Sequence, residues 1–244
     1  ETLTQAMAGA YNNSGLLEQN RALLRAADEG VAQSVAATMP VVTWAMSASR
    51  TEFSNAAIPS MNAAQLRVSS SLTLYDGGAS QLAIDAQKEV VLSTRQALRN
   101  IEQSVLQRAV QAYMGVLRDQ ETVQLRNNNV GLITQEFRAA QDRFDVGEVT
   151  RTDVSLAEAR LASARNQLAA AQGNLAVSQA EYVAATGRRA LNMQATGAHP
   201  IRRNLAQASA YAVRNHPNML ETQHSVAAAE LNLQRAQTAN SPRL

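Results

Sequence analysis

Residues 143–161, RFDVGEVTRTDVSLAEARL, are the stretch that decides the fold. Long helical patterns lie on both sides of it, and the pattern breaks once, at residues 145–147. Glycine ends helices readily because it adopts a positive φ at little cost. Thr150 then stands three residues before Asp153, which is the spacing of a capping box that opens a new helix. The stretch therefore predicts the tip of a long antiparallel helical hairpin.

The composition favours long helices over a globular core. Aromatic residues make up 4% of the 244 residues, and the chain is rich in alanine, glutamine, leucine and arginine, which suit helices. The net charge is +2 and basic residues are not interleaved with aromatic ones, so no nucleic-acid partner is predicted. The chain has no cysteine, which excludes disulfides and thiolate chemistry.

The hydropathy pattern contains no run of about 18 apolar residues, so no transmembrane helix is predicted. No signal peptide is visible at the N-terminus, and Glu1 is consistent with a processed start. These observations do not exclude transmembrane strands, which are short and only alternately apolar.

Two segments alternate with a period of two. Residues 41–53, VVTWAMSASRTEF, place Trp44 and Met46 on an apolar face and serine and threonine on the other. Residues 65–75, QLRVSSSLTLY, repeat the pattern after a loop that contains proline. Each run has about ten residues, the length that a tilted strand needs to cross a bilayer. Trp44 and Tyr75 lie at the ends away from the loop, as membrane-interface aromatics would. The alternative is an ordinary surface hairpin.

The helices on both sides of the tip are unusually long. Residues 79–145 contain no proline, and at ~1.5 Å per residue a helix over them approaches 100 Å. The helix after the tip carries a heptad seam of larger and smaller residues, typical of a coiled coil. Its members are Leu161, Leu168, Leu175 and Tyr182, with Ala164, Ala171 and Ser178 between them.

The last part of the chain repeats the first part. Asn13 matches Asn215 and Pro40 matches Pro242, which is an offset of 202 residues in both cases. If the repeat is real, two further strands should follow Pro242. The sequence is therefore expected to be about the first half of a longer protein, or a fragment of one.

The order of these segments resembles the TolC family of outer-membrane efflux and secretion channels. LTLYDGG at residues 72–78 resembles the family's strand-to-helix junction, and EQSVLQRAVQAYMGVLRD at 102–119 resembles its next helix. The tip keeps the pattern V-G-x-V-x-x-T-D-V at residues 146–154. N-x-x-L at 13–16 and A-x-x-P at 37–40 fit the family's opening helix.

The resemblance implies a mainly α fold with a small membrane β part: a long antiparallel coiled-coil hairpin from an α-barrel, plus two strands of a transmembrane β-barrel. It implies an N-terminal periplasmic helix over 1–40 and two outer-membrane strands with an extracellular loop over 41–76. The hairpin would span 77–187 with its periplasmic tip near 145–153. A connector would follow over 188–203, and the truncated first helix of the second repeat over 204–244.

The resemblance also implies partners. The full protein would be a homotrimer in the outer membrane of a Gram-negative cell, with helices in the periplasm. It would contact outer-membrane lipid, a periplasmic adaptor and an inner-membrane pump, and pass small molecules or proteins to the exterior. The other function considered is a soluble structural coiled coil that binds partner helices. The choice between a drug and a protein as substrate stays open.

Two sites follow from the resemblance. The first is adaptor docking at the tip by Val146, Gly147, Glu148 and Val149, for which the alternative is a plain helix–helix turn. The second is a periplasmic gate at Thr152 and Asp153, where cross-helix bonds to a carboxylate would close a pore. The alternative for Asp153 is the capping box with Thr150, and the two roles compete for one carboxylate.

No enzyme, cofactor or metal site is predicted. The sequence shows no nucleophile–base pair and no glycine-rich phosphate loop. His199, His216 and His224 have no ligand spacing and are expected at the surface. The carboxylates are scattered, mostly along the helices and at positions expected to be solvated: Asp76, Glu89, Glu102, Asp119, Glu121 and Glu158.

Overall fold

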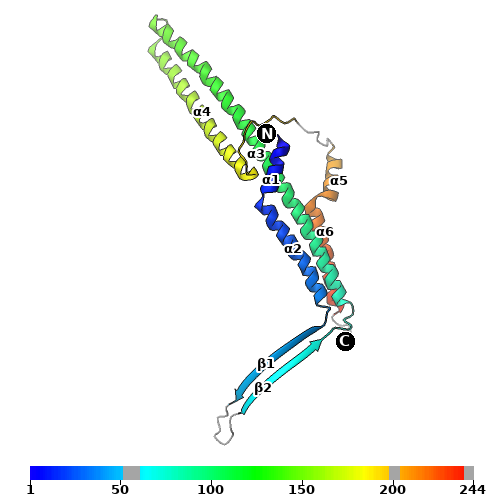
Figure 1. Cartoon of the computed structure of the whole chain (residues 1–244). Coiled ribbons are helices and arrows are strands. Elements are labelled where there is room, and N and C mark those ends of the chain that lie inside the picture. Colours follow the sequence, from blue (N-terminus) through cyan, green and yellow to red (C-terminus); the bar gives the residue numbers. More distant parts are fainter. Residues whose placement is uncertain (52–60, 198–203, 239–244) are drawn as a thin grey trace. The chain divides into compact units, whose positions relative to one another are not determined.

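The computed structural model describes residues 1–51, 61–197 and 204–238. Within these ranges the chain is mainly helical with one two-stranded antiparallel sheet. The elements are α1 (Leu3–Asn13), α2 (Gly15–Ala36), β1 (Val41–Thr51), β2 (Met61–Ser71), α3 (Ala79–Asp145), α4 (Arg151–Thr186), α5 (Leu205–Asn215) and α6 (Pro217–Gln237) (Figure 1). The chain divides into two compact units, Glu1–Asn20 with Arg99–Leu205 and Arg21–Leu98 with Ala206–Leu244.

The first unit contains the predicted helical hairpin from Arg99 onward, and the start of α3 belongs to the second unit. Helix α3 continues for 67 residues without a break, over the predicted range, and α4 returns antiparallel to its second part (Figure 1). The predicted heptad seam of α4 faces the hairpin interior: Leu161, Ala164, Ala171, Ser178 and Tyr182 are buried. Leu168 and Leu175 are half-buried. The coiled-coil interpretation of this hairpin is confirmed.

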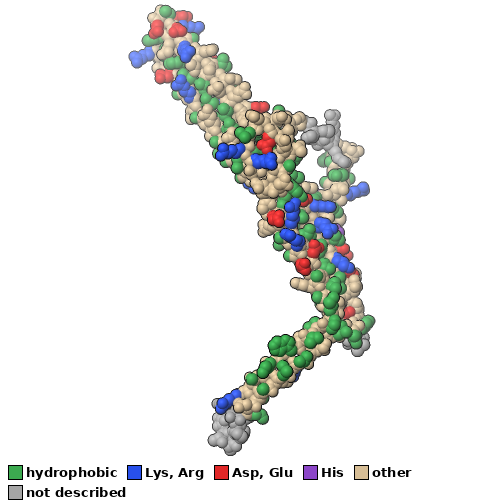
Figure 2. All heavy atoms as spheres, viewed as in Figure 1, with side chains coloured by type: hydrophobic (Ala, Val, Ile, Leu, Met, Phe, Trp, Pro, Cys, Tyr) green, Lys and Arg blue, Asp and Glu red, His purple; other side chains and the backbone are tan. Residues whose placement is uncertain are grey.

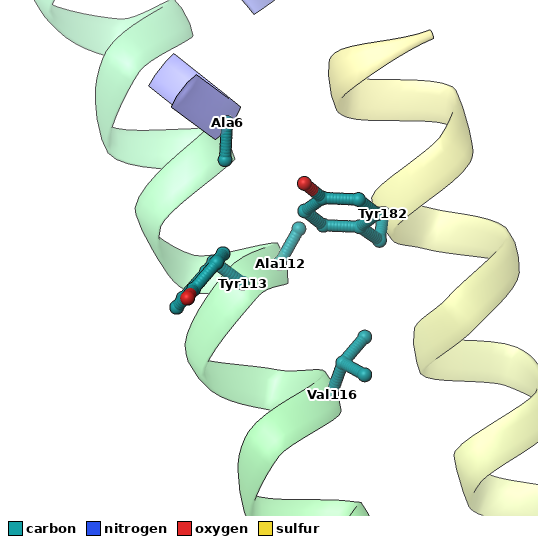
Figure 3. Packing of buried hydrophobic residues seen from close by; sticks show 5 residues of the cluster. All are labelled: Ala6, Ala112, Tyr113, Val116 and Tyr182. Carbon is teal, nitrogen blue, oxygen red and sulfur yellow. The ribbon is translucent and has the colours of Figure 1, made fainter. Parts of the chain in front are cut away.

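The hydrophobic core of this unit lies where α1 meets α3 and α4. Figure 3 shows Ala6 of α1 with Ala112, Tyr113 and Val116 of α3 and Tyr182 of α4. The rings of Tyr113 and Tyr182 pack with centroids 6.3 Å apart and planes tilted by 57°. Tilted aromatic pairs at this separation add stabilisation beyond the area that they bury.

The start of the predicted connector is bound to this core. The Tyr113 hydroxyl lies 2.7 Å from the carbonyl oxygen of Gln194 and 2.8 Å from that of Glu1, and it accepts a hydrogen bond from the Gln194 amide at 3.1 Å. Tyr113 itself is fully buried. Its hydroxyl thus ties the chain after α4 back to α3. The end of the connector, residues 198–203, lies outside the described residues.

The helix boundaries agree with the internal repeat. Helices α5 and α6 begin at Leu205 and Pro217, which is 202 residues after the starts of α1 and α2 at Leu3 and Gly15. Helices α1 and α5 each have 11 residues. The break between the helices is capped in both copies, by the Ser14 hydroxyl and by His216 Nδ1, each of which accepts a backbone N–H. Pro242 lies outside the described residues.

The second unit contains the strand pair, whose second strand differs from the prediction. Strand β2 begins at Met61 and ends at Ser71, so the predicted range of 65–75 is wrong at both ends. The register explains the shift: β1 begins after Pro40, and its first residue, Val41, pairs with Ser71. Residues from Leu72 onward therefore have no strand opposite them. The start of the loop, residues 52–60, lies outside the described residues.

The two faces of the sheet differ as predicted. Cross-strand pairs Trp44–Val68 and Met46–Leu66 lie on one face, where these side chains are 68–74% exposed. The other face carries polar groups, including a hydrogen bond of 2.8 Å between the hydroxyls of Thr43 and Ser69. Figure 2 shows hydrophobic side chains uncovered along the strands. Among the helices that the structure describes, none is both long enough and apolar enough to cross a membrane.

The junction between β2 and α3 is built by one carboxylate. Asp76 accepts hydrogen bonds from the Gly78 amide at 3.0 Å, the Ser80 amide at 2.7 Å and the Ser80 hydroxyl. The Ser80 hydroxyl is the main reason that the pKa of Asp76 lies below its usual value. Asp76 was expected to be a solvated carboxylate, whereas it closes the turn and caps α3.

Candidate functional site

The tip of the α3–α4 hairpin is a short, well-bonded turn. Helix α3 ends at Asp145, and Gly147 takes the left-handed conformation with φ of 79°. The Gly147 amide donates to the Phe144 carbonyl and the Glu148 amide donates to the Arg143 carbonyl, both at 2.9 Å. These bonds satisfy the carbonyl groups at the end of α3, so the turn is ordered by its own backbone.

The start of α4 is capped as the sequence predicted. The backbone amide of Thr150 donates to Asp153 Oδ2 at 2.9 Å, and the Thr150 hydroxyl donates to the same oxygen at 2.7 Å. The side-chain bond and then the backbone bond hold the pKa of Asp153 below its usual value. A carboxylate in the first turn also interacts favourably with the helix dipole. Both bonds end on Oδ2, so Oδ1 can accept from a further donor.

The predicted docking residues form an exposed surface at this turn. Val146 is 78% exposed, Gly147 and Glu148 are exposed, and Val149 is half-buried. Thr152 and Asp153 follow on α4 and are also exposed. The structure therefore brings all six predicted residues together at one end of the hairpin.

A small cavity adjoins the tip between the two helices. It has a volume of about 210 Å³ and is lined by Ile133, Glu136 and Ala140 of α3 and by Asp153, Leu156, Ala157 and Arg160 of α4. Farther along the hairpin, Arg126 Nη1 donates to Gln167 Oε1 at 2.8 Å. The helices that hold the tip are thus joined by polar as well as apolar contacts.

The two predicted membrane-interface aromatics have different surroundings. Trp44 lies within β1, opposite Val68, and is 74% exposed. Tyr75 is 54% exposed and lies four residues beyond the end of β2, in the turn that leads to α3. Tyr75 therefore does not end a strand, contrary to the prediction, because β2 stops where its partner strand begins.

One buried carboxylate was placed wrongly by sequence reasoning. Asp119 was expected to be solvated, but it is only 8% exposed and accepts a hydrogen bond from Ser178, which is equally buried on α4. Arg118 Nε donates to the same carboxylate at 2.9 Å, and this bond is the main reason that the pKa of Asp119 lies below its usual value. Its heptad position, seven residues after Ala112, is the signal that could have indicated burial.

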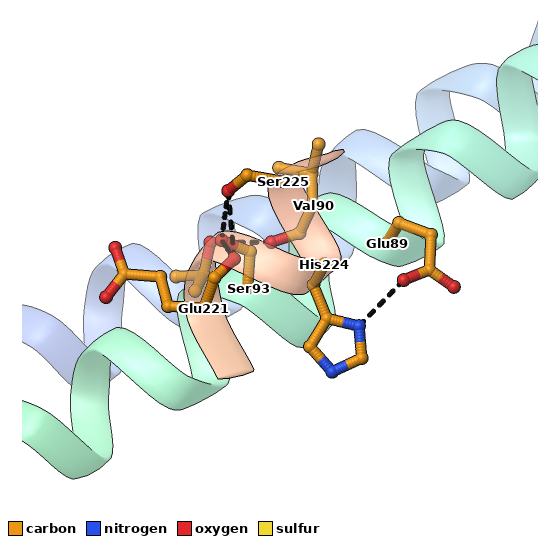
Figure 4. A network of polar contacts seen from close by, with 7 residues as sticks. Glu89, Val90, Ser93, Glu221, His224 and Ser225 are labelled. Atoms are coloured by element: carbon orange, nitrogen blue, oxygen red, sulfur yellow. Dashed lines mark hydrogen bonds and ion pairs between the residues drawn. The ribbon is translucent and has the colours of Figure 1, made fainter. Parts of the chain in front are cut away.

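A second missed contact joins α6 to α3 within the second unit. His224 Nδ1 lies 2.7 Å from Glu89 Oε2, and the hydroxyls of Ser93 and Ser225 lie 3.0 Å apart (Figure 4). Ser93 also donates to the Glu221 carbonyl at 3.3 Å. His224 was expected to be a surface residue, and it is instead half-buried against a carboxylate. His199 lies outside the described residues.

The described residues offer no metal centre. Residues 1–51, 61–197 and 204–238 contain no group of three or more histidine, aspartate or glutamate side chains that could hold a metal ion. The features that stand out are the capped, exposed tip and the exposed apolar face of the strands.

Together these features define a class of protein. An uninterrupted helical hairpin with an exposed, capped tip, in the same chain as a strand pair with one apolar face, is the architecture of a TolC-like outer-membrane efflux protein. The family described as "Outer membrane efflux protein" matches residues 8–188 of the sequence. The chain belongs to this family, which has no catalytic activity.

A curated relative supports the assignment. The chain is 34% identical over 243 residues to the outer membrane efflux protein BepC of Brucella suis biovar 1 (strain 1330). The match covers 99% of this chain and 53% of that protein, so the chain spans about half the length of the curated relative that it matches.

Solved structures show the same fold at low sequence identity. The chain superposes on CusC with a TM-score of 0.83 at 17% identity, over 99% of this chain and 57% of that one. It superposes on the outer-membrane channel OprN with a TM-score of 0.80 at 18% identity, over 99% and 56%. For the CmeC outer membrane channel of Campylobacter jejuni the TM-score is 0.79 at 16% identity, over 99% and 54%.

Proposed function

We propose that the full-length protein is the outer-membrane channel of a tripartite efflux or type I secretion system. The proposal rests mainly on the strand pair. One of its faces carries large apolar side chains that are exposed, and the opposite face is polar. A soluble protein rarely leaves such a row of large apolar side chains in water. In a membrane barrel, the apolar face would contact lipid and the polar face would line a water-filled lumen.

The proposed assembly is a homotrimer. Residues 41–76 would contribute two strands to a shared membrane barrel, with Trp44 and Tyr75 as interface aromatics. Residues 1–40 and 77–187 would build the periplasmic helical wall. The connector at 188–203 and the helices at 204–244 would lead into a second repeat.

The proposed site of adaptor docking is the tip, at Val146, Gly147, Glu148 and Val149. The exposed Val146 side chain supports this role, because it lies on a turn whose backbone is already ordered. A partner that binds this turn therefore loses little free energy to ordering the backbone. A photo-crosslinking residue in place of Val146 should join the adaptor in cells. The same residue in place of the exposed Leu125, in the middle of α3, should not.

The proposed gate consists of Thr152 and Asp153. In the capping box only Oδ2 of Asp153 is used, so a donor on a neighbouring helix could bond Oδ1 without breaking the cap. The Asp153→Ala variant of the full-length protein should raise single-channel conductance in planar bilayers. The Asp142→Ala variant, which removes the same charge from α3 near the tip, should leave conductance unchanged. Equal conductance in both variants and the wild type would leave Asp153 with a capping role alone.

The channel proposal is tested by fractionation of the full-length protein. It should stay in the outer-membrane fraction when the membranes are washed with high salt, and it should be released only by detergent. The released protein should have the mass of a trimer by light scattering. A deletion strain should accumulate a fluorescent pump substrate, and the full-length gene should restore its export. Recovery in the soluble fraction without detergent would refute the channel and favour a soluble coiled coil that binds partner helices.

A further inference from the structure

A polar layer interrupts the apolar seam between α3 and α4. Asp119 and Arg126 stand one heptad apart on α3, at positions that apolar residues hold in the flanking heptads. Asp119 accepts from the Ser178 hydroxyl, and Arg126 donates to Gln167. A cavity of about 240 Å³ lies beside these pairs, lined by Asp119, Thr122, Arg126, Gln167, Ala170, Ala171 and Asn174.

Between the tip and the Tyr113–Tyr182 contact, the apolar part of the seam does not define one alignment of the helices. On α4, Leu161, Leu168 and Leu175 recur every seven residues, and Ala164 and Ala171 recur between them. If α4 slid along α3 by seven residues, about 10 Å, leucine would replace leucine and alanine would replace alanine along most of the contact. Packing alone therefore discriminates weakly between these registers.

The hydroxyl of Ser178 does discriminate between them. A slide of one heptad places either Ala171 or Ala185 opposite Asp119, and neither side chain can donate a hydrogen bond. A buried carboxylate that loses a donor is costly. Arg118 does not compensate, because it is the sequence neighbour of Asp119 and accompanies it in every register.

The second polar pair penalises one direction of sliding. The slide that brings Ala171 opposite Asp119 also brings Arg160 toward Arg126, in place of Gln167. Two guanidinium groups would then face each other at the exposed edge of the seam, where like charges repel. Both polar contacts on α3 thus favour the alignment that is present.

We propose that Asp119 and Ser178 form a register lock for the α3–α4 hairpin. The turn at the tip connects the two helices, and the buried pair fixes their alignment at a point 26 residues up α3 from Asp145. A single buried polar contact in an otherwise repetitive coiled coil is a known way to specify alignment, at some cost in stability. The lock positions the tip relative to the rest of the hairpin, and it does not depend on what the tip binds.

The 244 residues of the sequence contain no cysteine, so the test introduces cysteine pairs after any cysteine elsewhere in the full-length protein has been replaced. In the full-length protein, Asn174→Cys is paired with Thr122→Cys, since both residues line the same cavity and report the native register. Two other pairs, Asn174→Cys with Gly115→Cys or with Asn129→Cys, report slides of seven residues in either direction. A short bis-maleimide joins the cysteines, and a product of monomer mass marks a link within one chain. Each pair is placed in the wild type, in Ser178→Ala and in Ser178→Thr.

The expected result is a change in the ratio of slipped to native links. Ser178→Ala should raise that ratio at least about tenfold, equivalent to ~1.4 kcal/mol between the registers. Ser178→Thr keeps a hydroxyl and should restore the wild-type ratio. The double variant Asp119→Ala/Ser178→Ala removes the buried carboxylate, so it should fold and still show the slipped links.

Two outcomes would overturn the lock. One is a Ser178→Ala protein with a lower unfolding temperature but an unchanged ratio of links, which would make the pair an ordinary buried hydrogen bond. The other is a double variant that forms native links alone, since it lacks the lock whether or not Ser178→Ala can be purified.

Discussion

Gly147 and Gly187 end α3 and α4 in the same left-handed conformation but in different surroundings. Their φ angles are 79° and 72°. A Cβ atom added at Gly147 would meet no atom within 4 Å, whereas one at Gly187 would lie 1.6 Å from Asn13 Nδ2. A side chain at either position would therefore strain the left-handed backbone, and a side chain at Gly187 would also clash with a neighbouring residue.

The Gly147→Ala variant should therefore lose about 1–2 kcal/mol, which is the strain of a left-handed alanine. Gly187→Ala should lose about 2–5 kcal/mol, because the Asn13 side chain must also move. Thermal unfolding followed by circular dichroism measures both. Adding Asn13→Ala to Gly187→Ala should recover the steric part, and no recovery would show that the clash is not the cause.

The cap at Asp153 should make stability depend on pH. The folded-state pKa of Asp153 lies below its usual value of 3.8, so its contribution is present above about pH 4 and is lost as the pH falls through the folded pKa. Asp153→Asn should unfold at a lower temperature than the wild type at pH 7, and the two should converge as the pH falls below the folded pKa of Asp153. A difference that persists at low pH would show that charge is not what stabilises the cap. Asp142→Asn, outside the cap, serves as the control.

The residue-scale predictions succeeded where the cause was local. Thr150 and Asp153 are three residues apart, so their capping box can be found by spacing alone. The burial of Asp119 depends on Ser178, which is 59 residues away, and the partner of His224 is 135 residues away. No spacing within one helix indicates which far side chain lies opposite. The docking and gating roles of the tip residues stay predictions.

At the scale of elements, two buried tyrosines allow a matched comparison. The Tyr113 hydroxyl bonds the Gln194 backbone, whereas the Tyr182 hydroxyl has no partner among the described residues. Burial raises the pKa of Tyr182 to about 12. The two rings pack on each other, so phenylalanine at either position keeps the apolar contact.

Tyr113→Phe should cost about 1–3 kcal/mol, since it leaves buried backbone groups of the connector unpaired. Tyr182→Phe should stay within about 0.5 kcal/mol of the wild type, or gain stability, because it removes an unpaired buried hydroxyl. Hydrogen exchange should be faster at residues 191–197 in Tyr113→Phe alone. Equal losses in the two variants would mean that Tyr182 has a partner.

The elements themselves were largely predictable, with one instructive error. The long helices, the break near Ser14 and the tip follow from glycine, proline and heptad patterns within each segment. The end of β2 does not, because the alternation of residues 65–75 continues past Ser71. Only pairing with β1, which starts after Pro40, ends the strand. Strand ends depend on a partner, and helix ends mostly do not.

At the scale of the whole molecule, the repeat and the strand pair both bear on whether the exposed apolar surface is covered in a larger assembly. Helices α5 and α6 reproduce the boundaries of α1 and α2, which in the first repeat lead directly into β1. Helix α5 has no buried residue, and Tyr211 is 51% exposed on it. Much apolar surface in both units is therefore uncovered, as expected if the strands contact lipid and the helices contact further parts of an assembly.

The two faces of β1 provide the sharpest test of that arrangement. Met46 pairs with Leu66 on the apolar face, and Ser47 pairs with Gln65 on the polar face. Adjacent residues of a strand point to opposite faces. If one face meets lipid and the other a wet lumen, a charged maleimide should label Ser47→Cys in intact outer membranes and leave Met46→Cys unlabelled. The 244 residues of the sequence contain no cysteine, so the labelling is specific once any cysteine elsewhere in the full-length protein has been replaced.

Both variants should label fully after unfolding in detergent and urea, which controls for reactivity. Trp44 is the single tryptophan of the 244 residues, and it gives an independent reading of the same face once any tryptophan elsewhere in the full-length protein has been replaced. Its fluorescence should be quenched by lipids brominated near the headgroup and resist aqueous iodide. If Met46→Cys labels as fast as Ser47→Cys and iodide quenches Trp44, the apolar face lies in water. The strand pair would then be a surface hairpin, and the proposed channel would lose the observation on which it rests.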